Sequence, residues 1–207
     1  MIRLAQDGAL WRVTIDRPDK ANSLTPGMLS EIADIAEAAK AAAKVFVLTG
    51  AGKVFSAGAD IEAARAGLAT DPVWERLSGA IAALPCLTIA ALNGTLAGGA
   101  FGMALACDLR IAVPEAKFFY PVMSLGFLPQ PSDPGRLVAL VGPARARLIL
   151  MAGAKLTADE ALGAGLVDRI VPRDGLDAAV AELAAATLAA TPAHAAAIKA
   201  MTGAATG

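Results

Sequence analysis

The stretch LNGTLAGGA at residues 92–100, followed by the apolar residues 101–107, predicts a strand end, a tight turn and a helix that begins on glycines. The first N–H groups of a helix have no partner inside the helix, and the helix dipole adds partial positive charge there. Such a helix end can hold an oxyanion. A second candidate donor loop, FSAGAD, lies upstream at residues 55–60. Together the two loops predict a two-donor oxyanion hole that needs no reactive side chain.

Length, charge and cysteine content limit the classes of protein that this chain can be. Its 207 residues suit one domain with a modest appendage. A formal net charge of −1 removes the main driving force for nucleic-acid binding. Cys86 and Cys107 lack the spacing of a metal site or a disulfide framework, and the amino terminus lacks the pattern of a signal peptide. We therefore expect a cytoplasmic protein with no bound metal and no nucleic-acid partner.

The strongly apolar composition raises the question of a membrane span. Residues 77–107 contain no charged residue and are long enough to cross a bilayer. However, Pro85, the pair Asn93–Gly94 and the pair Gly98–Gly99 divide this run into shorter pieces. A buried strand followed by a helix that begins on glycines explains these breaks better than a membrane span does, so we expect no membrane association.

Hydrophobic periodicity predicts alternating strands and helices, which indicates an α/β fold. A proline-rich loop is expected at residues 120–134, and mostly helical structure from residue 142 onward. Thr25 is the expected N-cap of the first helix. The predicted strands cover residues 10–15, 45–49, 86–92, 109–113 and a short segment near 167–171, and the predicted helices cover residues 26–43, 71–84 and 98–107.

Several motifs that would indicate other chemistries are incomplete. The segment GAGKV at residues 50–54 has neither the first glycine nor the Ser or Thr of a phosphate loop, and it lacks the third glycine of a dinucleotide fingerprint. No nucleophile elbow is present. The single histidine, His194, lies in an alanine-rich segment, where a surface position is the simpler interpretation and a Ser-His-Asp triad is disfavoured. We expect Asp108 to cap or pair locally.

Four ordered motifs resemble those of one family, the crotonase or enoyl-CoA hydratase/isomerase superfamily. The resemblance runs from residue 10 to about residue 172. The motifs are DRPDKAN at residues 16–22, LTG at 48–50 with SAGAD at 56–60, NG at 93–94 with GG at 98–99 and ALACDLRIA at 104–112, and LTADEA at 156–161 with GLV at 165–167.

The resemblance implies a crotonase-like (ClpP/crotonase) α/β domain, a spiral of ββα units that occupies residues 1–172. It implies a shortened helical segment at 173–207, a homotrimer or dimer of trimers, and an acyl-CoA thioester substrate with no separate cofactor. The thioester oxygen would lie between the N–H groups of Ala59 and Gly99. The resemblance also places five residues along the coenzyme A path: Lys20, Ala21, Ala57, Asp60 and Ile61. For Lys20, contact with phosphates and a solvated turn position are equally good interpretations.

Departures from the family pattern concern proton transfer. The two glutamates of the hydratases fall on Gly102 and Val122, and a further acidic position used by some relatives falls on Gln130. None of these side chains can serve as an acid or base. Tyr120, Asp133 and Asp60 are the remaining polar candidates for an acid or base. Asp133 could instead cap the helix after Pro134, and Tyr120 could be a packed aromatic with a satisfied hydroxyl. We expect an acyl-CoA-acting protein that stabilises a thioester enolate with little hydratase activity; a different crotonase-type reaction and a non-catalytic acyl-CoA-binding or partner protein are the alternatives.

Overall fold

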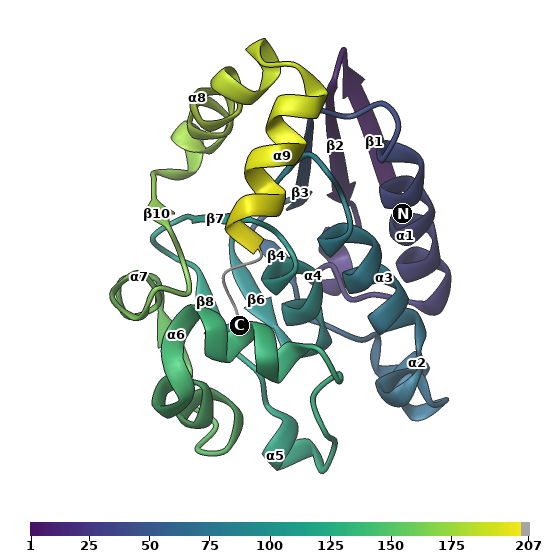
Figure 1. Cartoon of the computed structure of the whole chain (residues 1–207). Coiled ribbons are helices and arrows are strands. Elements are labelled where there is room, and N and C mark those ends of the chain that lie inside the picture. The colour runs from purple at the N-terminus through teal and green to yellow at the C-terminus, as the bar shows by residue number, and fades with distance from the viewer. Residues whose placement is uncertain (204–207) are drawn as a thin grey trace.

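A computed structural model describes residues 1–203 and shows two mixed β-sheets surrounded by helices (Figure 1). The larger sheet has six strands in the order β1-β2-β3-β5-β7-β10, and the smaller has four in the order β4-β6-β8-β9. Among the described residues, only the β1–β2 and β8–β9 pairs are antiparallel. The strands are β1 Ile2–Asp7, β2 Leu10–Ile15, β3 Val45–Gly50, β4 Val54–Ser56, β5 Leu87–Leu92, β6 Thr95–Ala97, β7 Leu109–Ala112, β8 Lys117–Phe119, β9 Leu156–Thr157 and β10 Arg169–Ile170.

The helices follow pairs of strands in a repeating ββα order. β3 and β4 precede α2, β5 and β6 precede α4, and β7 and β8 precede α5. In each pair the first strand joins the larger sheet and the second joins the smaller one. This confirms the expected α/β spiral. The helices are α1 Pro26–Ala39, α2 Ile61–Arg65, α3 Val73–Ala82, α4 Phe101–Leu105, α5 Val122–Leu125, α6 Asp133–Leu150, α7 Ala158–Ala164, α8 Leu176–Ala189 and α9 Pro192–Gly203.

The turns between β3 and β4 and between β5 and β6 are joined through Asn93 and Gly94. The Asn93 side chain accepts a hydrogen bond from the Gly50 N–H at 3.0 Å and donates one to the Gly52 carbonyl at 3.0 Å. A β-carbon on Gly94 would lie 1.9 Å from the carbonyl oxygen of Lys53, so only glycine fits there. This close approach brings β4 and β6 into register, and with them the two loops that follow.

The principal strands and helices confirm the sequence-based prediction, with shifted ends. Thr25 caps α1, accepting a hydrogen bond from the Met28 N–H at 3.4 Å. The helix stops at Ala39 rather than at residue 43, because the following residues turn so that the Lys44 N–H can bond to Ala9 and enter β3. The predicted helix at residues 98–107 is a 3₁₀ turn, Gly98–Ala100, followed by the short α4.

The sequence-based prediction did not include the edge strand β1, the short helix α2 or the smaller sheet. The strands of the smaller sheet have two or three residues each, too few to show an alternating pattern. The proline-rich segment at residues 120–134 is also more ordered than predicted, because it contains α5 and the first residues of α6. Within α6, Gly142 has a non-helical conformation (φ 76°) before Pro143, so the helix is kinked there.

Helices α8 and α9 cover the amino-terminal ends of the large sheet's strands. Lys44, just before β3, donates from Nζ to the carbonyl oxygens of Leu188 (2.9 Å) and Ala190 (2.7 Å). Lys199 on α9 binds Asp108, just before β7, at 2.8 Å. The expectation that Asp108 caps or pairs locally was therefore wrong: its partners, Lys199 and the Thr88 N–H, are distant in the sequence. Residues 204–207 of the predicted helical segment 173–207 lie outside the described residues.

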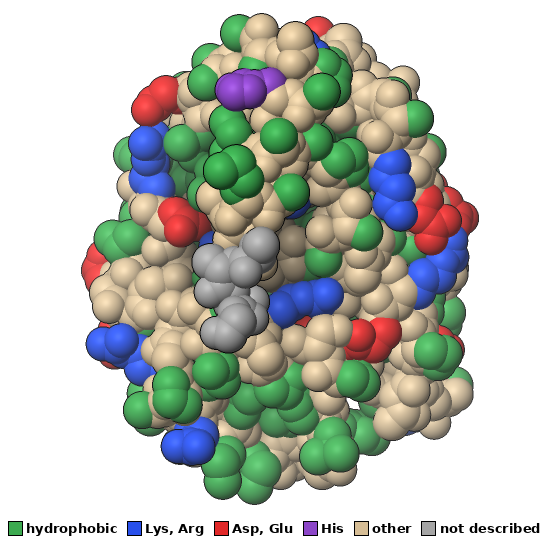
Figure 2. All heavy atoms as spheres, in the orientation of Figure 1, with side chains coloured by type: hydrophobic (Ala, Val, Ile, Leu, Met, Phe, Trp, Pro, Cys, Tyr) green, Lys and Arg blue, Asp and Glu red, His purple; other side chains and the backbone are tan. Residues whose placement is uncertain are grey.

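Within residues 1–203, no single helix is long and apolar enough to cross a bilayer. By length and composition alone, α8 with its preceding turn (Arg173–Ala189) and α9 would suffice together, but the two are bent by 110°. His194 on α9 is exposed, as predicted, and is the purple side chain in Figure 2.

Candidate active site

In the loop after β4, the N–H of Ala59 points away from the neighbouring segment around Leu24. On one side, the Leu24 N–H donates to the Gly58 carbonyl and the Asp60 N–H donates to the Leu24 carbonyl, both at 2.8 Å. This is a single parallel bridge between Leu24 and Ala59. Because alternate N–H groups of an extended chain point in opposite directions, the Ala59 N–H is directed to the other side of the loop. Within residues 1–203 it has no hydrogen-bond acceptor.

The loop after β6 presents a second such donor at Gly99. Gly98 has a φ of 58°, a left-handed conformation that favours glycine. Gly99 is the second residue of the 3₁₀ turn, so its N–H precedes the first hydrogen bond of that turn. The side of Gly99 is closed by Trp74, because a β-carbon there would lie 3.1 Å from the indole ring. Nothing in the sequence indicates this contact, because Trp74 is one apolar residue among many on α3.

The two loops lie against each other. Gly58 has a φ of 90°, and a β-carbon on it would lie 3.3 Å from the Gly99 nitrogen and 2.9 Å from the Ala97 carbonyl oxygen. Only glycine allows this approach. The tertiary structure therefore brings together the two segments that the sequence singled out as donors.

Both loops open into a cavity of about 340 Å³. Its wall is mostly apolar, and hydrophobic side chains also gather on the surface over α5, at the lower end of Figure 2. Among the described residues, no carboxylate lines the cavity. The lining residues are Ala57, Ala59, Ile61, Ala64, Arg65, Ala69, Trp74, Ala97, Gly98, Gly99, Phe119, Tyr120, Pro121, Val122, Leu125, Phe127, Leu128 and Gln130.

Tyr120 is the one ionisable hydroxyl of the cavity wall. Its ring stacks on Phe101 with centroids 5.3 Å apart. Its hydroxyl donates to Asp133 Oδ2 at 2.9 Å and accepts a longer bond, 3.4 Å, from the Gln130 N–H. Burial, followed by the neighbouring Asp133 charge, raises the pKa of Tyr120 well above its usual range. Tyr120 is therefore a packed aromatic with a satisfied hydroxyl, and it also connects the cavity to a carboxyl group.

Asp133 lies behind Tyr120, with only 1% of its surface exposed. Its Oδ1 has no hydrogen-bond partner in the described part of the chain. Burial raises the pKa of Asp133 to about 6, and Glu75 adds to this effect, while the Tyr120 hydrogen bond and Arg136 oppose it. The prediction that Asp133 caps the following helix was wrong: Ser132 occupies the N-cap position, and Asp133 is the first residue of α6. Ser132 is held by Glu75 through its N–H and its hydroxyl, which leaves Asp133 turned inward.

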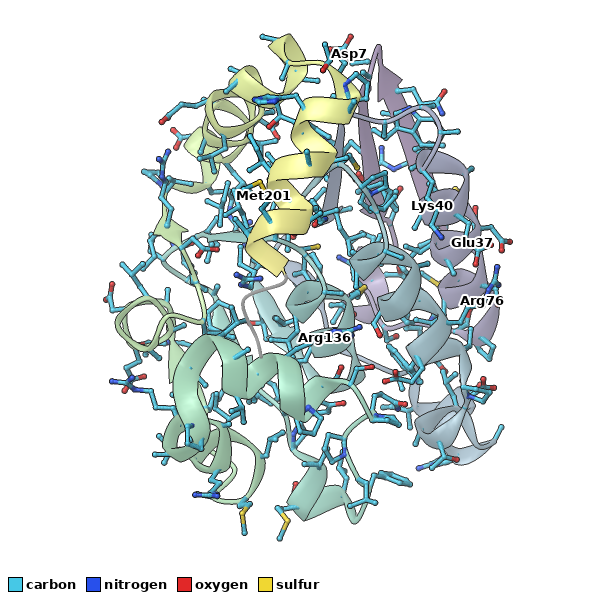
Figure 3. All side chains as sticks on the ribbon, viewed as in Figure 1. Asp7, Glu37, Lys40, Arg76, Arg136 and Met201 are labelled. Atoms are coloured by element: carbon cyan, nitrogen blue, oxygen red, sulfur yellow. The ribbon has the colours of Figure 1, made fainter. Side chains whose placement is uncertain are left out.

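The carboxyl group of Asp133 occupies the space beside Gly102. A β-carbon on Gly102 would lie 2.8 Å from Asp133 Oδ1 and 3.3 Å from Oδ2. Arg136 comes from the next turn of α6, near α4 (Figure 3), and its Nη1 is buried without a partner within residues 1–203. Val122 is buried at the start of α5, on the cavity wall. Positions 102 and 122 therefore face a pre-existing carboxyl group and the cavity, respectively.

The other five predicted binding residues are divided between the cavity and its surroundings. Ala57 and Ile61 line the cavity, whereas Lys20 is exposed on the turn before α1. Asp60 is engaged, because it caps α2 and pairs with Arg17 at 2.8 Å. The Arg17 hydrogen bond holds the pKa of Asp60 below its usual range.

The main chain also links this region together. The Ala57 N–H donates to the Ala21 carbonyl at 3.0 Å, and Ala21 itself has a left-handed φ of 50°. Through this hydrogen bond, Ala21 helps to hold the donor loop in place. Cys86 and Cys107 are remote from the cavity, and burial raises the pKa of their thiols to about 11 and about 12.

This architecture, a single domain with two mixed sheets and paired donor loops, is the crotonase fold. The chain belongs to the enoyl-CoA hydratase/isomerase family, whose sequence model, Enoyl-CoA hydratase/isomerase, matches residues 5–206. The resemblance stated from the motifs and the expected fold class are both confirmed.

Individual relatives agree with this assignment. The chain is similar to the carnitinyl-CoA dehydratase of Salmonella arizonae, with 37% identity over 212 residues that cover 97% of this chain and 79% of the relative. An enoyl-CoA hydratase structure from Mycobacterium avium has a TM-score of 0.91 and 34% identity, covering 99% of this chain and 85% of its own. A Thermobifida fusca protein solved in complex with CoA has a TM-score of 0.87 and 31% identity, covering 97% of this chain and 83% of its own.

Proposed function

We propose that this protein binds acyl-CoA thioesters and stabilises the thioester enolate with the N–H groups of Ala59 and Gly99. The observation that carries the proposal is a pair of N–H groups that have no partner within residues 1–203, on two touching loops that open into one apolar cavity. Family membership and the relative in complex with CoA support it.

The geometry suits a reaction in which negative charge develops on the thioester oxygen. Fixed N–H donors stabilise such charge without reorganising, and in a water-poor cavity each donor contributes about 10²–10³-fold to the rate. The apolar wall, including Trp74 and Val122, would accommodate the acyl group. Ala57 and Ile61 lie on the same wall, and we propose that Lys20, Ala21 and Asp60 lie further along the path of the coenzyme A portion.

Replacing Gly99 by proline tests the proposed oxyanion hole, because proline removes the donor. We expect Gly99→Pro to weaken binding of the acetoacetyl-CoA enolate about 100-fold, the typical contribution of one donor. Gly99→Ala is the matched control: it keeps the N–H and adds a methyl group 3.1 Å from Trp74. Isothermal titration of both variants measures the difference. Equal affinities for the two, or a liganded crystal structure with the thioester directed away from both loops, would overturn the proposal.

We expect little hydration of crotonyl-CoA. By resemblance, Gly102 and Val122 stand where the family's hydratases carry glutamates, and Gln130 stands at a further acidic position. Loss of a proton-transfer group typically costs about 10²–10⁴-fold in rate. Loss of enoyl absorbance in a steady-state assay measures the reaction. A turnover rate typical of an efficient hydratase would contradict this expectation.

A non-catalytic acyl-CoA-binding protein is the second candidate function. The observation that favours it is the lack of a carboxylate on the described cavity wall. Tight binding of several acyl-CoA thioesters with no chemical change in any of them would distinguish this candidate from an enzyme.

We also propose that the protein forms a homotrimer or a dimer of trimers, as the family resemblance implies. Helix α9 has no buried residue, and its Ile198 and Met201 are 50% and 77% exposed. Apolar side chains of this kind favour association. Light scattering at micromolar concentration measures the oligomeric state.

A further inference from the structure

We propose that Tyr120 and Asp133 form a proton relay that removes the α-proton of a bound acyl-CoA thioester and returns it. Tyr120 would be the catalytic residue that contacts the substrate, and Asp133 would act through it. The inference rests on the proposed acyl-CoA binding and assigns a proton path to the same site.

The two side chains lie in order, with Tyr120 on the cavity wall and Asp133 behind it. Tyr120 follows β8 and lines the cavity, whereas Asp133 begins α6 and does not. The ring of Tyr120 is fixed by its stack on Phe101, so the hydroxyl is held against Asp133 Oδ2 at 2.9 Å. The side chain of Tyr120 therefore lies between the cavity and the carboxyl group of Asp133.

Asp133 has the environment of a group that exchanges a proton. It is 1% exposed, and its Oδ1 has no partner among the described residues. A carboxyl group that served only to support the fold would be expected to have both oxygens hydrogen-bonded. Helix α4 contributes no charge here because Gly102 faces the carboxyl group, and the charged neighbours are Arg136 on α6 and Glu75 on α3. Burial raises the pKa of Asp133 to about 6, Glu75 raises it further and Arg136 opposes this shift. A general base is effective at a pKa close to neutral pH.

The proposed step balances without an oxidant, reductant or leaving group. The Tyr120 oxygen takes the α-proton as its own proton passes to Asp133 Oδ2. The electron pair of the broken C–H bond becomes the enolate, whose oxygen accepts hydrogen bonds from Ala59 and Gly99. The reverse transfer restores the thioester and the Asp133 carboxylate. In effect, a carboxyl group from α6 occupies the space beside residue 102 that a side chain from α4 would otherwise fill.

Deuterium exchange into butyryl-CoA tests the relay. The full-length protein is incubated with butyryl-CoA in D₂O, and mass spectrometry follows label at the α-carbon. We expect exchange whose rate rises with pH through about 6 and is flat above it, because the ionised carboxyl group is the acceptor. Tyr120→Phe and Asp133→Asn should each reduce exchange at least 100-fold, within the range typical of a general base. Asp159→Asn, on an exposed aspartate of α7, is the matched control and should leave exchange unchanged.

Binding and exchange are measured separately, so the two proposals can fail independently. If titration detects no binding of butyryl-CoA, the proposed function is wrong. If the protein binds butyryl-CoA but does not exchange its α-proton, or if Tyr120→Phe keeps more than a third of the exchange rate, the relay is wrong. Tyr120→Phe removes a single oxygen and preserves the stack on Phe101, so it decides the question even if Asp133→Asn does not fold. A pH profile of Asp133→Asn that keeps the inflection near 6 would also overturn the role of Asp133.

Discussion

Glutamate in place of Gly102 is expected to destabilise the protein by about 3–5 kcal/mol, the typical cost of an uncompensated buried charge, rather than to create a hydratase. The space beside Gly102 is already occupied, because a β-carbon there would lie 2.8 Å from Asp133 Oδ1. Asp133 is almost fully buried and belongs to a rigid helix, so it has little freedom to move away. A second carboxylate at this point would add like-charge repulsion to the steric overlap.

Two further variants separate the steric and electrostatic parts of this effect. Gly102→Ala adds the β-carbon alone and should cost about 1–3 kcal/mol, as overpacking of a core does. The double variant Gly102→Glu/Asp133→Gly removes the opposing carboxyl group and should recover at least half of the loss. Urea unfolding gives the free energies, and a crotonyl-CoA assay gives the activity. A Gly102→Glu protein that is as stable as the parent and hydrates crotonyl-CoA rapidly would show that the space is not occupied as described.

Replacing Asp133 by asparagine is expected to stabilise the protein at pH 7.5 and to remove part of its pH dependence. Below about pH 4, Asp133 is protonated in both the folded and the unfolded chain, so it contributes no pH dependence. Between about 4 and 6 the unfolded chain releases this proton while the folded protein retains it, because burial raises the folded pKa from 3.8 to about 6. The folded state then binds more protons, so the free energy of unfolding falls as pH rises through this window. Above it the penalty is constant, at about 3 kcal/mol.

Urea unfolding at pH 4, 5, 6 and 7.5 measures this effect as the difference between the parent and Asp133→Asn. Asparagine keeps an acceptor oxygen for the Tyr120 hydroxyl, so the hydrogen bond is preserved while the charge is removed. Asp60 and Glu160, whose pKa values are lowered, act with the opposite sign, but they are present in both proteins and cancel in the difference. Asp159→Asn serves as the exposed control. If the parent and Asp133→Asn showed the same pH dependence, Asp133 would not carry the buried charge proposed here.

Asp133 lowers the free energy of unfolding at neutral pH. A buried, half-satisfied carboxyl group destabilises the fold at neutral pH. An apolar residue of similar size in place of Asp133 would avoid this cost. Its position behind the only tyrosine of the chain, on the wall of the cavity that holds both donor loops, is the reason to connect it with proton transfer.

The sequence alone determined the large sheet, apart from its edge strand β1, and the two donor loops. Buried parallel strands such as β3 and β5 are long apolar runs between glycine turns, and this local pattern is visible without any tertiary contact. The loops around Ala59 and Gly99 were also predictable, because glycines and alanines in a short turn allow close approach of the backbone whatever surrounds them. The four ordered motifs fixed the family for the same reason, since each combines turn residues with the start of an element.

Only the tertiary structure decided what surrounds the donors. The strands β4, β6 and β8 have too few residues to show a period, and they exist because the neighbouring strands of the small sheet supply their hydrogen bonds. Gly99 and Trp74, which are in contact, are 25 positions apart in the sequence, so no local sequence pattern indicates their contact. The role of Asp133 was misjudged because a Ser-Asp-Pro sequence offers two possible N-caps, and the choice depends on Glu75, which belongs to a distant helix and holds Ser132. Local chemistry therefore specified the backbone donors, whereas long-range packing placed the carboxyl group that we propose to serve them.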